Sequence, residues 1–128
     1  MRRFLTILAL IVELFILMSS PARAEPDVLT APEIEALLSG NTAVGDWSGT
    51  PYRQFFGENG TTIYVPQGGR EDWGRWRTNA ETGQYESFWE RSGWSGYGVA
   101  GGDGQYFWVQ SDGTRQPFEM VEGRALSD

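Results

Sequence analysis

The chain has 128 residues and a formal net charge of −7, and it contains no histidine, cysteine or lysine. These absences exclude imidazole and thiolate metal sites, Ser-His and Cys-His nucleophile pairs, and lysine Schiff bases. The negative charge argues against nucleic acid and anionic membrane surfaces as partners, and the length predicts a single domain.

The first 24 residues have the pattern of a secretory signal peptide. Two arginines follow the initiator methionine, an apolar run extends over residues 4–18, and Ala-Arg-Ala at residues 22–24 is a small-x-small cleavage site. The apolar run is shorter than the ~20 residues of a spanning helix and contains Glu13, which argues against a membrane anchor. We therefore predict export to the periplasm or the medium as a mature domain of residues 25–128, with a net charge of −9 (7 arginines against 16 acidic residues).

One short helix is predicted at about residues 31–39. Thr30 is a good N-cap, and Glu33 three residues later completes a capping box. The apolar side chains that share one face of this helix are Ile34, Leu37 and Leu38. Because a helix of this length is marginal in water alone, we expect the apolar face to dock on one end of the structure that follows.

Short aromatic and β-branched runs separated by Gly, Asn and Asp follow residue 40, which is typical of an all-β meander. About seven or eight strands are predicted, at residues 44–47, 52–56, 61–65, 72–77, 84–90, 95–100, 105–109 and 114–120. No connection is long enough for a crossover helix, so neighbouring strands should pair antiparallel. A small up-and-down barrel or a strongly curled sheet removes exposed edges most simply.

Large rings are expected to stabilise this cysteine-free domain in place of disulfides, since each ring buries ~150–250 Å². Strand alternation puts rings on both faces of the sheet, as in Tyr106 and Trp108 against Phe107. Only one set can face the barrel interior. We expect that set to fill the barrel rather than to leave a deep cavity.

A possible contact surface lies in the aromatic segment of residues 83–109. The alternation of residues 96–99 turns two glycines outward, and these are either covered by neighbouring rings or form a shallow aromatic trough for a ligand or protein loop. The residues assigned to the trough are Trp89, Trp94, Trp108, Gly96 and Gly98. Trp94 is the strongest of them, because it lies in a Gly/Ser-rich turn where core packing is hard.

Three arginines are candidates for contact with an anion: Arg70, Arg75 and Arg77. They alternate with Glu71 and Asp72, so local pairing on a solvated face is the alternative interpretation. Stacking of an arginine on Trp73 or Trp76 is a further structural use.

Several segments resemble an uncharacterised family of small exported bacterial proteins: LLSGN, WSGTPYRQFF, NGTTIYV, GRWR, QYESFWE and WSGY. The similarity spans roughly residues 29–121. It implies export and a β-rich fold, and it implies no known activity. It also implies that relatives place cysteines where this chain has Glu86 and Gly96, so that a hairpin disulfide would be absent here.

The sequence favours a monomeric, non-catalytic binding module without a cofactor or metal, whose partner is a small ligand or a cationic exported protein. The first alternative is an acidic inhibitor of a basic exported enzyme such as a lysozyme, because of the negative charge. The second is a carboxylate-dependent hydrolase. Glu86 and Glu90 lie about 13 Å apart along their strand, outside the ~5–9.5 Å that paired catalytic carboxyls need.

Overall fold

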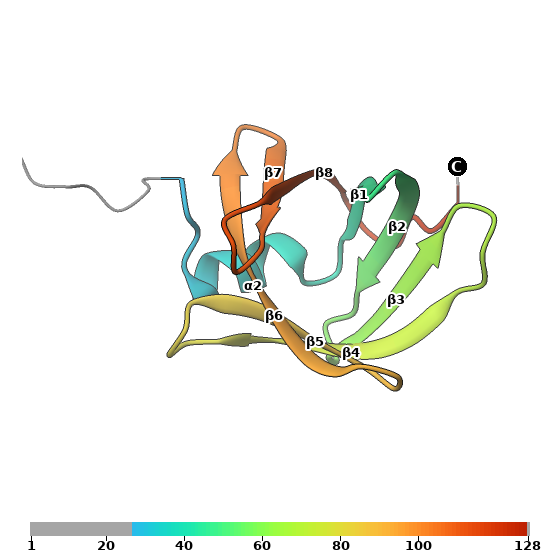
Figure 1. Ribbon diagram of the computed structural model, residues 1–128, viewed down its shortest axis with the longest axis horizontal. Helices are drawn as coiled ribbons and strands as arrows, with labels where there is room; N and C mark the ends of the chain where they lie inside the picture. Colours follow the sequence, from blue (N-terminus) through green and yellow to red (C-terminus); the bar gives the residue numbers. More distant parts are fainter. Residues whose placement is uncertain (1–26, 128) are drawn as a thin grey trace, which may run out of the picture.

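The computed structural model describes residues 27–127, so the predicted signal peptide lies outside the described residues. These residues form one short helix and a closed barrel of eight antiparallel strands (Figure 1). The elements are α2 (Ala31–Leu38), β1 (Thr42–Trp47), β2 (Thr50–Phe56), β3 (Thr61–Pro66), β4 (Asp72–Asn79), β5 (Gln84–Trp89), β6 (Gly93–Gly102), β7 (Gln105–Val109) and β8 (Arg115–Val121). Each strand pairs with its sequence neighbours, and β8 closes the barrel on β1. The predicted up-and-down barrel is confirmed.

The hairpins follow from local turn chemistry. Between β2 and β3, the Asn59 side chain accepts a hydrogen bond from the backbone N–H of Thr61 at 3.0 Å, and Gly60 has a φ of 87° that favours glycine. Between β5 and β6, the register makes Glu86 and Gly96 direct cross-strand partners.

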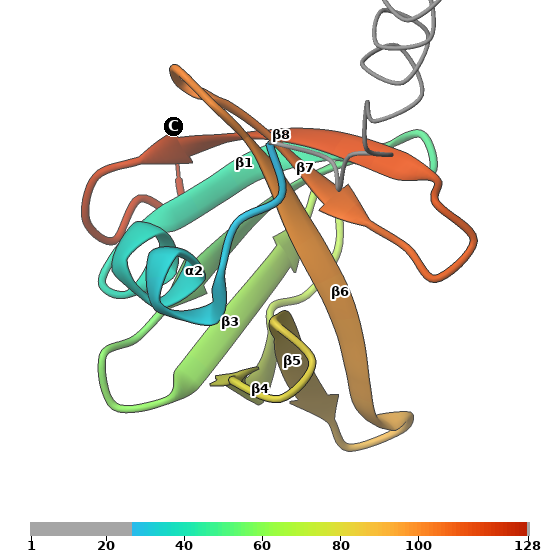
Figure 2. The same cartoon turned by 90° about the vertical axis from the view of Figure 1, so that its left-hand side faces the viewer.

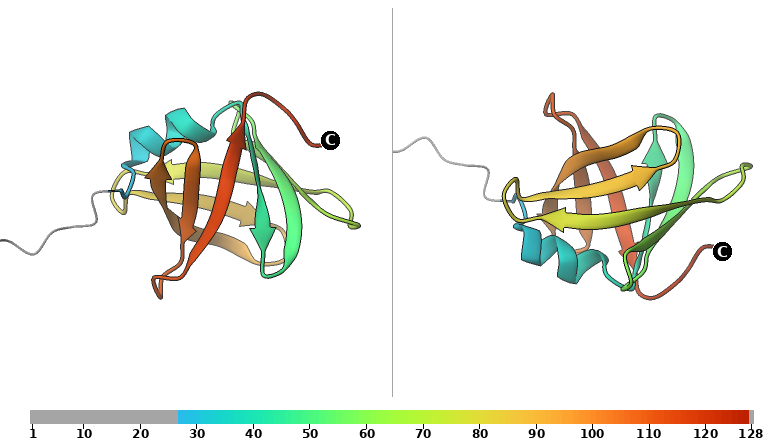
Figure 3. Two further views of the ribbon diagram at one scale, coloured as in Figure 1. Left: turned by 90° about the horizontal axis from the view of Figure 1, so that it is seen from above. Right: turned by 90° about the horizontal axis from the view of Figure 1, so that it is seen from below.

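The helix closes one end of the barrel. Its capping box is formed, since the Thr30 N–H donates to Glu33 Oε1 at 2.9 Å and the Glu33 N–H donates to Thr30 Oγ1 at 3.3 Å. Ile34 and Leu38 are fully buried in the core. Figure 2 shows α2 in front of the strands, and both views of Figure 3 place α2 and the β3–β4 loop at opposite ends of the molecule.

The chain enters α2 along the edge of β6 that lies beyond the end of β5, and it covers this edge. The Leu29 N–H donates to the Val99 carbonyl at 2.8 Å, and the Gly101 N–H donates to the Asp27 carbonyl at 2.8 Å. Arg115 on β8 binds the Asp27 carboxylate at 2.8 Å. These contacts fix the direction in which the helix begins.

Aromatic residues fill the half of the barrel next to α2. Phe56 and Trp76 meet edge-to-face with their ring centroids 5.6 Å apart, and both belong to the buried cluster that includes Ile34 and Leu38. Trp76 Nε1 donates to the Gly57 carbonyl at 2.8 Å, so its buried polar atom is satisfied. In this half, the predicted filled interior is confirmed.

The C-terminal segment packs over the outer face of β1 and β2. Thr42 Oγ1 donates to the Gly123 carbonyl at 2.7 Å and accepts from the Ala125 N–H at 2.9 Å. The Arg124 guanidinium lies over the Phe55 ring, 5.6 Å from its centroid. An outward ring on β2 is therefore covered by this segment.

Candidate functional site

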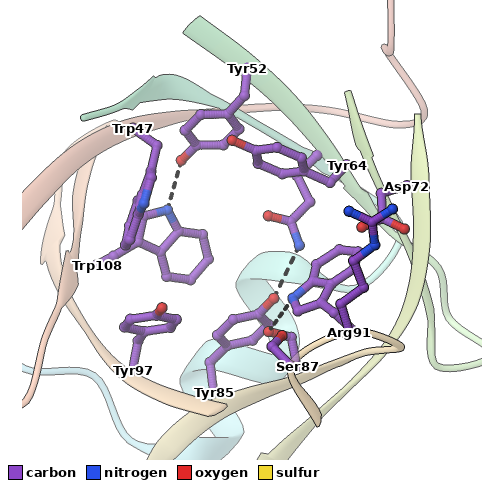
Figure 4. A pocket seen from close by; sticks show the side chains of 12 residues that line it. Trp47, Tyr52, Tyr64, Asp72, Tyr85, Ser87, Arg91, Tyr97 and Trp108 are labelled. Carbon is purple, nitrogen blue, oxygen red and sulfur yellow. Dashed lines mark hydrogen bonds between the residues drawn. The ribbon is translucent and has the colours of Figure 1, made fainter. Parts of the chain in front are cut away.

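A cavity of about 310 Å³ lies at the barrel end opposite α2 (Figure 4). We call it the cup. Its lining residues are Trp47, Tyr52, Gln54, Tyr64, Asp72, Tyr85, Ser87, Trp89, Arg91, Ser92, Tyr97 and Trp108. The prediction of a filled barrel is therefore wrong for this half. The rings here lie along the wall and against one another rather than across the barrel, and no helix of residues 27–127 enters from this end.

Four half-buried rings form the wall of the cup. Trp47 meets Tyr97 edge-to-face with centroids 5.6 Å apart, and Tyr64 meets Trp89 edge-to-face at 6.1 Å. In Figure 4, Trp47 and Tyr97 lie on one side of the hollow and Tyr64 lies on the other. Within each pair the two rings support each other's orientation, and the space between the two pairs stays open.

Two glycines on inward positions make room for cup residues. A Cβ on Gly74 would lie 2.7 Å from Cε3 of the Trp89 indole. A Cβ on Gly45 would lie 3.0 Å from the Tyr52 hydroxyl oxygen and 2.9 Å from the Pro117 carbonyl oxygen. Glycine at these positions therefore lets the indole and the phenol lie flat against the strands.

The floor of the cup is built from buried rings. Trp108 Nε1 donates to the Tyr52 hydroxyl at 2.8 Å. Tyr85 lies beside Trp108 with centroids 4.9 Å apart, and Phe118 stacks on the indole of Trp108 at 4.2 Å. Tyr52, Tyr85 and Trp108 are each about 3% exposed, so the floor is held in place from below.

Gln54 is the polar centre of the floor. Its Nε2 donates to Thr62 Oγ1 at 2.9 Å and to the Tyr85 hydroxyl at 3.1 Å. The Thr62 hydroxyl donates its hydrogen to the Phe55 carbonyl at 2.9 Å. Toward Gln54, the Thr62 oxygen can therefore act only as an acceptor. The direction of the Gln54 amide is therefore fixed by the network.

Burial keeps the floor phenols protonated. Removal from water raises the pKa of Tyr85 to about 12 and raises the pKa of Tyr52 even though Trp108 donates to it. Burial also raises the pKa of Tyr64, with a smaller contribution from the negative charge of Asp46. At neutral pH these side chains present hydroxyl groups, not phenolates.

Charges occur only at the mouth of the cup. Asp72 begins β4 and Arg91 lies in the β5–β6 loop, and both residues are exposed. Within residues 27–127, Asp72 supplies the one carboxylate of the lining, so the cup holds no carboxylate pair. No group of three potential metal ligands occurs in that part of the chain.

The structure does not bring the three tryptophans of the predicted trough together. Trp108 lies in the cup floor and Trp89 in the cup wall. Trp94 is 42% exposed on the outer face, beside its strand partner Phe88 at 5.5 Å. The assignment of Trp108 to a surface trough was wrong. Trp108 on β7 faces the barrel interior, where it meets Tyr52 of β2.

The two outward glycines do not form an open groove. The Gln84 side chain lies over Gly96, where its Oε1 would be 2.7 Å from an added Cβ. The Val109 side chain contacts the outer side of Gly98, at 3.4 Å from the same point. The two glycines are thus covered, but by an amide and a valine and not by the neighbouring rings that were expected.

The three candidate arginines do not form an anion clamp. Arg77 binds Glu86 across the strands at 2.8 Å, which holds the pKa of that carboxyl below its usual range, and lies 3.7 Å over the Trp94 ring. Arg70 and Arg75 are exposed, in the β3–β4 loop and on the outer face of β4. Among residues 27–127, no ion pair joins these arginines to Glu71 or Asp72. The Glu71 carboxylate instead accepts a hydrogen bond from Trp73 Nε1 at 3.0 Å.

The sequence interpretation missed most of the cup. A usable signal was Gln54, which alternates with Tyr52 and Phe56 on one strand face. A polar side chain between two inward aromatic residues needs a buried partner or an internal cavity. The structure supplies both.

Fold and site together define a closed up-and-down β-barrel with one helical end and one aromatic cup. No family profile, no curated protein and no solved structure matches the chain. No helix among residues 27–127 is long and apolar enough to cross a membrane.

Proposed function

We propose that the protein binds one small molecule in the cup and does not transform it. The observation that carries the proposal is the cavity of about 310 Å³, lined by seven aromatic side chains and open at one end of a barrel whose other end is closed. Preformed pockets of this size with a mostly aromatic lining and few polar groups are typical of small-molecule sites.

The construction of the cup supports binding over catalysis. Its wall rings are held in edge-to-face pairs, and its floor is fixed by the hydrogen bond that Trp108 donates to Tyr52 and by those that Gln54 donates to Thr62 and Tyr85. The charged side chains Asp72 and Arg91 lie at the mouth and not on the floor. A rigid, uncharged interior gives affinity without supplying an acid or base at depth.

The proposal includes export to the periplasm or the medium. The pattern of residues 1–24 supports it. Such a protein would meet its ligand outside the cytoplasm. N-terminal sequencing of the protein purified from the extracytoplasmic fraction should begin at Glu25, and recovery of Met1 from the cytoplasm would contradict this part of the proposal.

A ligand screen by thermal shift and tryptophan fluorescence tests the binding function. A compound that binds the cup should raise the Tm of the protein, and Trp47→Ala should weaken its binding at least about tenfold by removing one wall ring. The matched control is Trp73→Ala, since Trp73 is 53% exposed outside the cup. Equal binding by both variants, or no binding by any compound in a broad screen, would contradict the proposal.

A further inference from the structure

The hydrogen bonds of the cup floor leave few polar atoms for a ligand. Trp108 Nε1 donates to the Tyr52 hydroxyl, and Trp89 Nε1 donates to Ser87 Oγ at 3.1 Å. Gln54 Nε2 donates two hydrogen bonds, to Thr62 and to Tyr85. The donors of these three side chains are therefore occupied within the protein.

Tyr52 retains one donor. Its oxygen accepts from Trp108 Nε1, which leaves its hydroxyl hydrogen for another acceptor, and no hydrogen bond donated by Tyr52 occurs within the described residues. Because burial raises the pKa of Tyr52, this group remains a neutral donor.

Gln54 retains one acceptor. The Thr62 hydroxyl fixes the amide so that Nε2 faces Thr62 and Tyr85, which turns Oε1 away from both. Oε1 has no hydrogen-bond partner, yet no buried unpaired side-chain polar atom occurs in the described part of the chain. Oε1 is therefore accessible from the cup that Gln54 lines.

The balance between rings and free polar atoms favours an aromatic ligand over a sugar. Seven rings line the cup, while the hydrogen-bond network fixes one donor, on Tyr52, and one acceptor, on Gln54. The other hydroxyls of the lining belong to Tyr64, Tyr85, Ser87, Ser92 and Tyr97. A sugar carries a hydroxyl on most carbons, and each one that is buried without a partner costs affinity. A flat ring system instead stacks on the wall rings and needs few hydrogen bonds.

The charge and the size of the cup further limit the chemical class of the ligand. In the described part of the chain no charged side chain lies on the floor, and Asp72 and Arg91 at the mouth have opposite signs, so a buried ionic group would be uncompensated. A volume of about 310 Å³ corresponds to on the order of ten water-sized groups at ~30 Å³ each, which is one or two fused rings.

We infer that the cup binds a flat, uncharged heteroaromatic molecule or cyclic amide of one or two fused rings, which accepts a hydrogen bond from Tyr52 and donates one to Gln54. This inference rests on the proposed small-molecule function. Tyr52 and Gln54 are two residues apart on the same face of β2, about 7 Å along the strand, so one small molecule can reach both.

Ligand-side changes test the inference on the unaltered full chain. The probes are 2-quinolone and 4-quinolone, their N-methyl derivatives, naphthalene and methyl glucoside, with binding measured by tryptophan fluorescence and calorimetry. We expect at least one quinolone to bind about tenfold more tightly than naphthalene, and its N-methyl derivative to lose about tenfold because Gln54 loses its donor. Tyr52→Phe should reduce quinolone binding about tenfold and leave naphthalene binding unchanged, with near-UV circular dichroism as the check on folding.

The outcomes separate the two proposals. If naphthalene or the glucoside binds as tightly as the quinolones and Trp47→Ala weakens that binding, the cup is a ligand site and the inferred class is wrong. Unchanged affinity for N-methyl probes overturns the assignment of Gln54 as acceptor. If no probe and no compound of the broad screen binds, the proposed function itself fails.

Discussion

The two ends of the barrel are lined by similar rings but differ in what lies between them. At the α2 end, the fully buried Ile34 and Leu38 belong to the same core cluster as Phe56 and Trp76, and the interior is closed. At the other end, rings such as Trp47 and those facing it are only half buried, and a cavity remains. An eight-stranded barrel is therefore not filled by rings from its own strands alone, even when the sequence supplies many of them.

The difference has a geometric cause. An aromatic side chain attached to the wall of a barrel gains most by lying against its neighbours in edge-to-face or stacked contact. Such contacts run around the wall, as in Trp47 with Tyr97 and Tyr64 with Trp89, and leave the axis empty. Aliphatic side chains that approach along the axis are needed to close it, and α2 provides them at one end.

Removing an aliphatic side chain from the closed end should give the largest effect. Leu38→Ala would leave a cavity where a fully buried side chain now packs, and we expect a loss of about 2–5 kcal/mol in the free energy of unfolding, measured in urea. Leu37→Ala on the same helix is the control, because Leu37 is only partly buried. Equal losses in the two variants would show that α2 does not close the barrel through Leu38.

The floor between the two ends should titrate at alkaline pH. Tyr85 has a pKa of about 12 in the folded protein, and an unfolded tyrosine has a pKa of about 10. Between these values the unfolded state loses its proton first, so stability is fully present below pH ~10 and falls as the pH rises toward ~12, by about 2–3 kcal/mol.

Urea unfolding curves from pH 8 to 12 measure this loss. Tyr85→Phe removes one titrating group and should reduce the slope of the curve across that interval, while Tyr52 and Tyr64, whose pKa values burial also raises, keep part of the slope. If the free energy of unfolding fell as steeply with pH in Tyr85→Phe as in the parent protein, the burial of Tyr85 would not contribute to the loss of stability at alkaline pH.

The start of α2 offers a smaller test of the closed end. Thr30→Ala removes the side chain that caps the helix, and we expect a loss of about 1 kcal/mol in the free energy of unfolding. Thr30→Ser keeps the hydroxyl and should retain most of the stability. If ligand affinity in the cup fell as sharply as stability in Thr30→Ala, the two ends would not be independent.

The fold was predictable from local signals, while the cup was not. The capping box at Thr30 and the turn at Gly60 each depend on residues close in sequence, and strand pairing followed because every connection is short. The cup depends on which inward rings meet across the barrel. Trp47 and Tyr97 are fifty residues apart in sequence, and only the closed register of eight strands brings them together.

Alternation also left the trough prediction incomplete. It correctly opposed Tyr106 and Trp108 to Phe107, but it did not say which face would be the interior at each strand. Trp89 and Trp108 were therefore grouped with Trp94, although the barrel separates them. The deciding information is the register that pairs Trp94 with Phe88, which no short segment of sequence contains.

The smallest effect is expected outside the barrel, at Trp94. Its indole is 42% exposed and contacts Phe88 and the Arg77 guanidinium on the outer face, so Trp94→Ala should lower the free energy of unfolding by less than about 1 kcal/mol. Trp94→Phe keeps a ring beside Phe88 and should be closer still to the parent. If the free energy of unfolding measured in urea fell by more than about 2 kcal/mol, Trp94 would stabilise the fold as much as a core residue does. Because Trp94 lies outside the cup, quinolone binding should be unchanged in both variants. A changed affinity would mean that packing on the outer face of the barrel affects the position of the cup residues on the inner face.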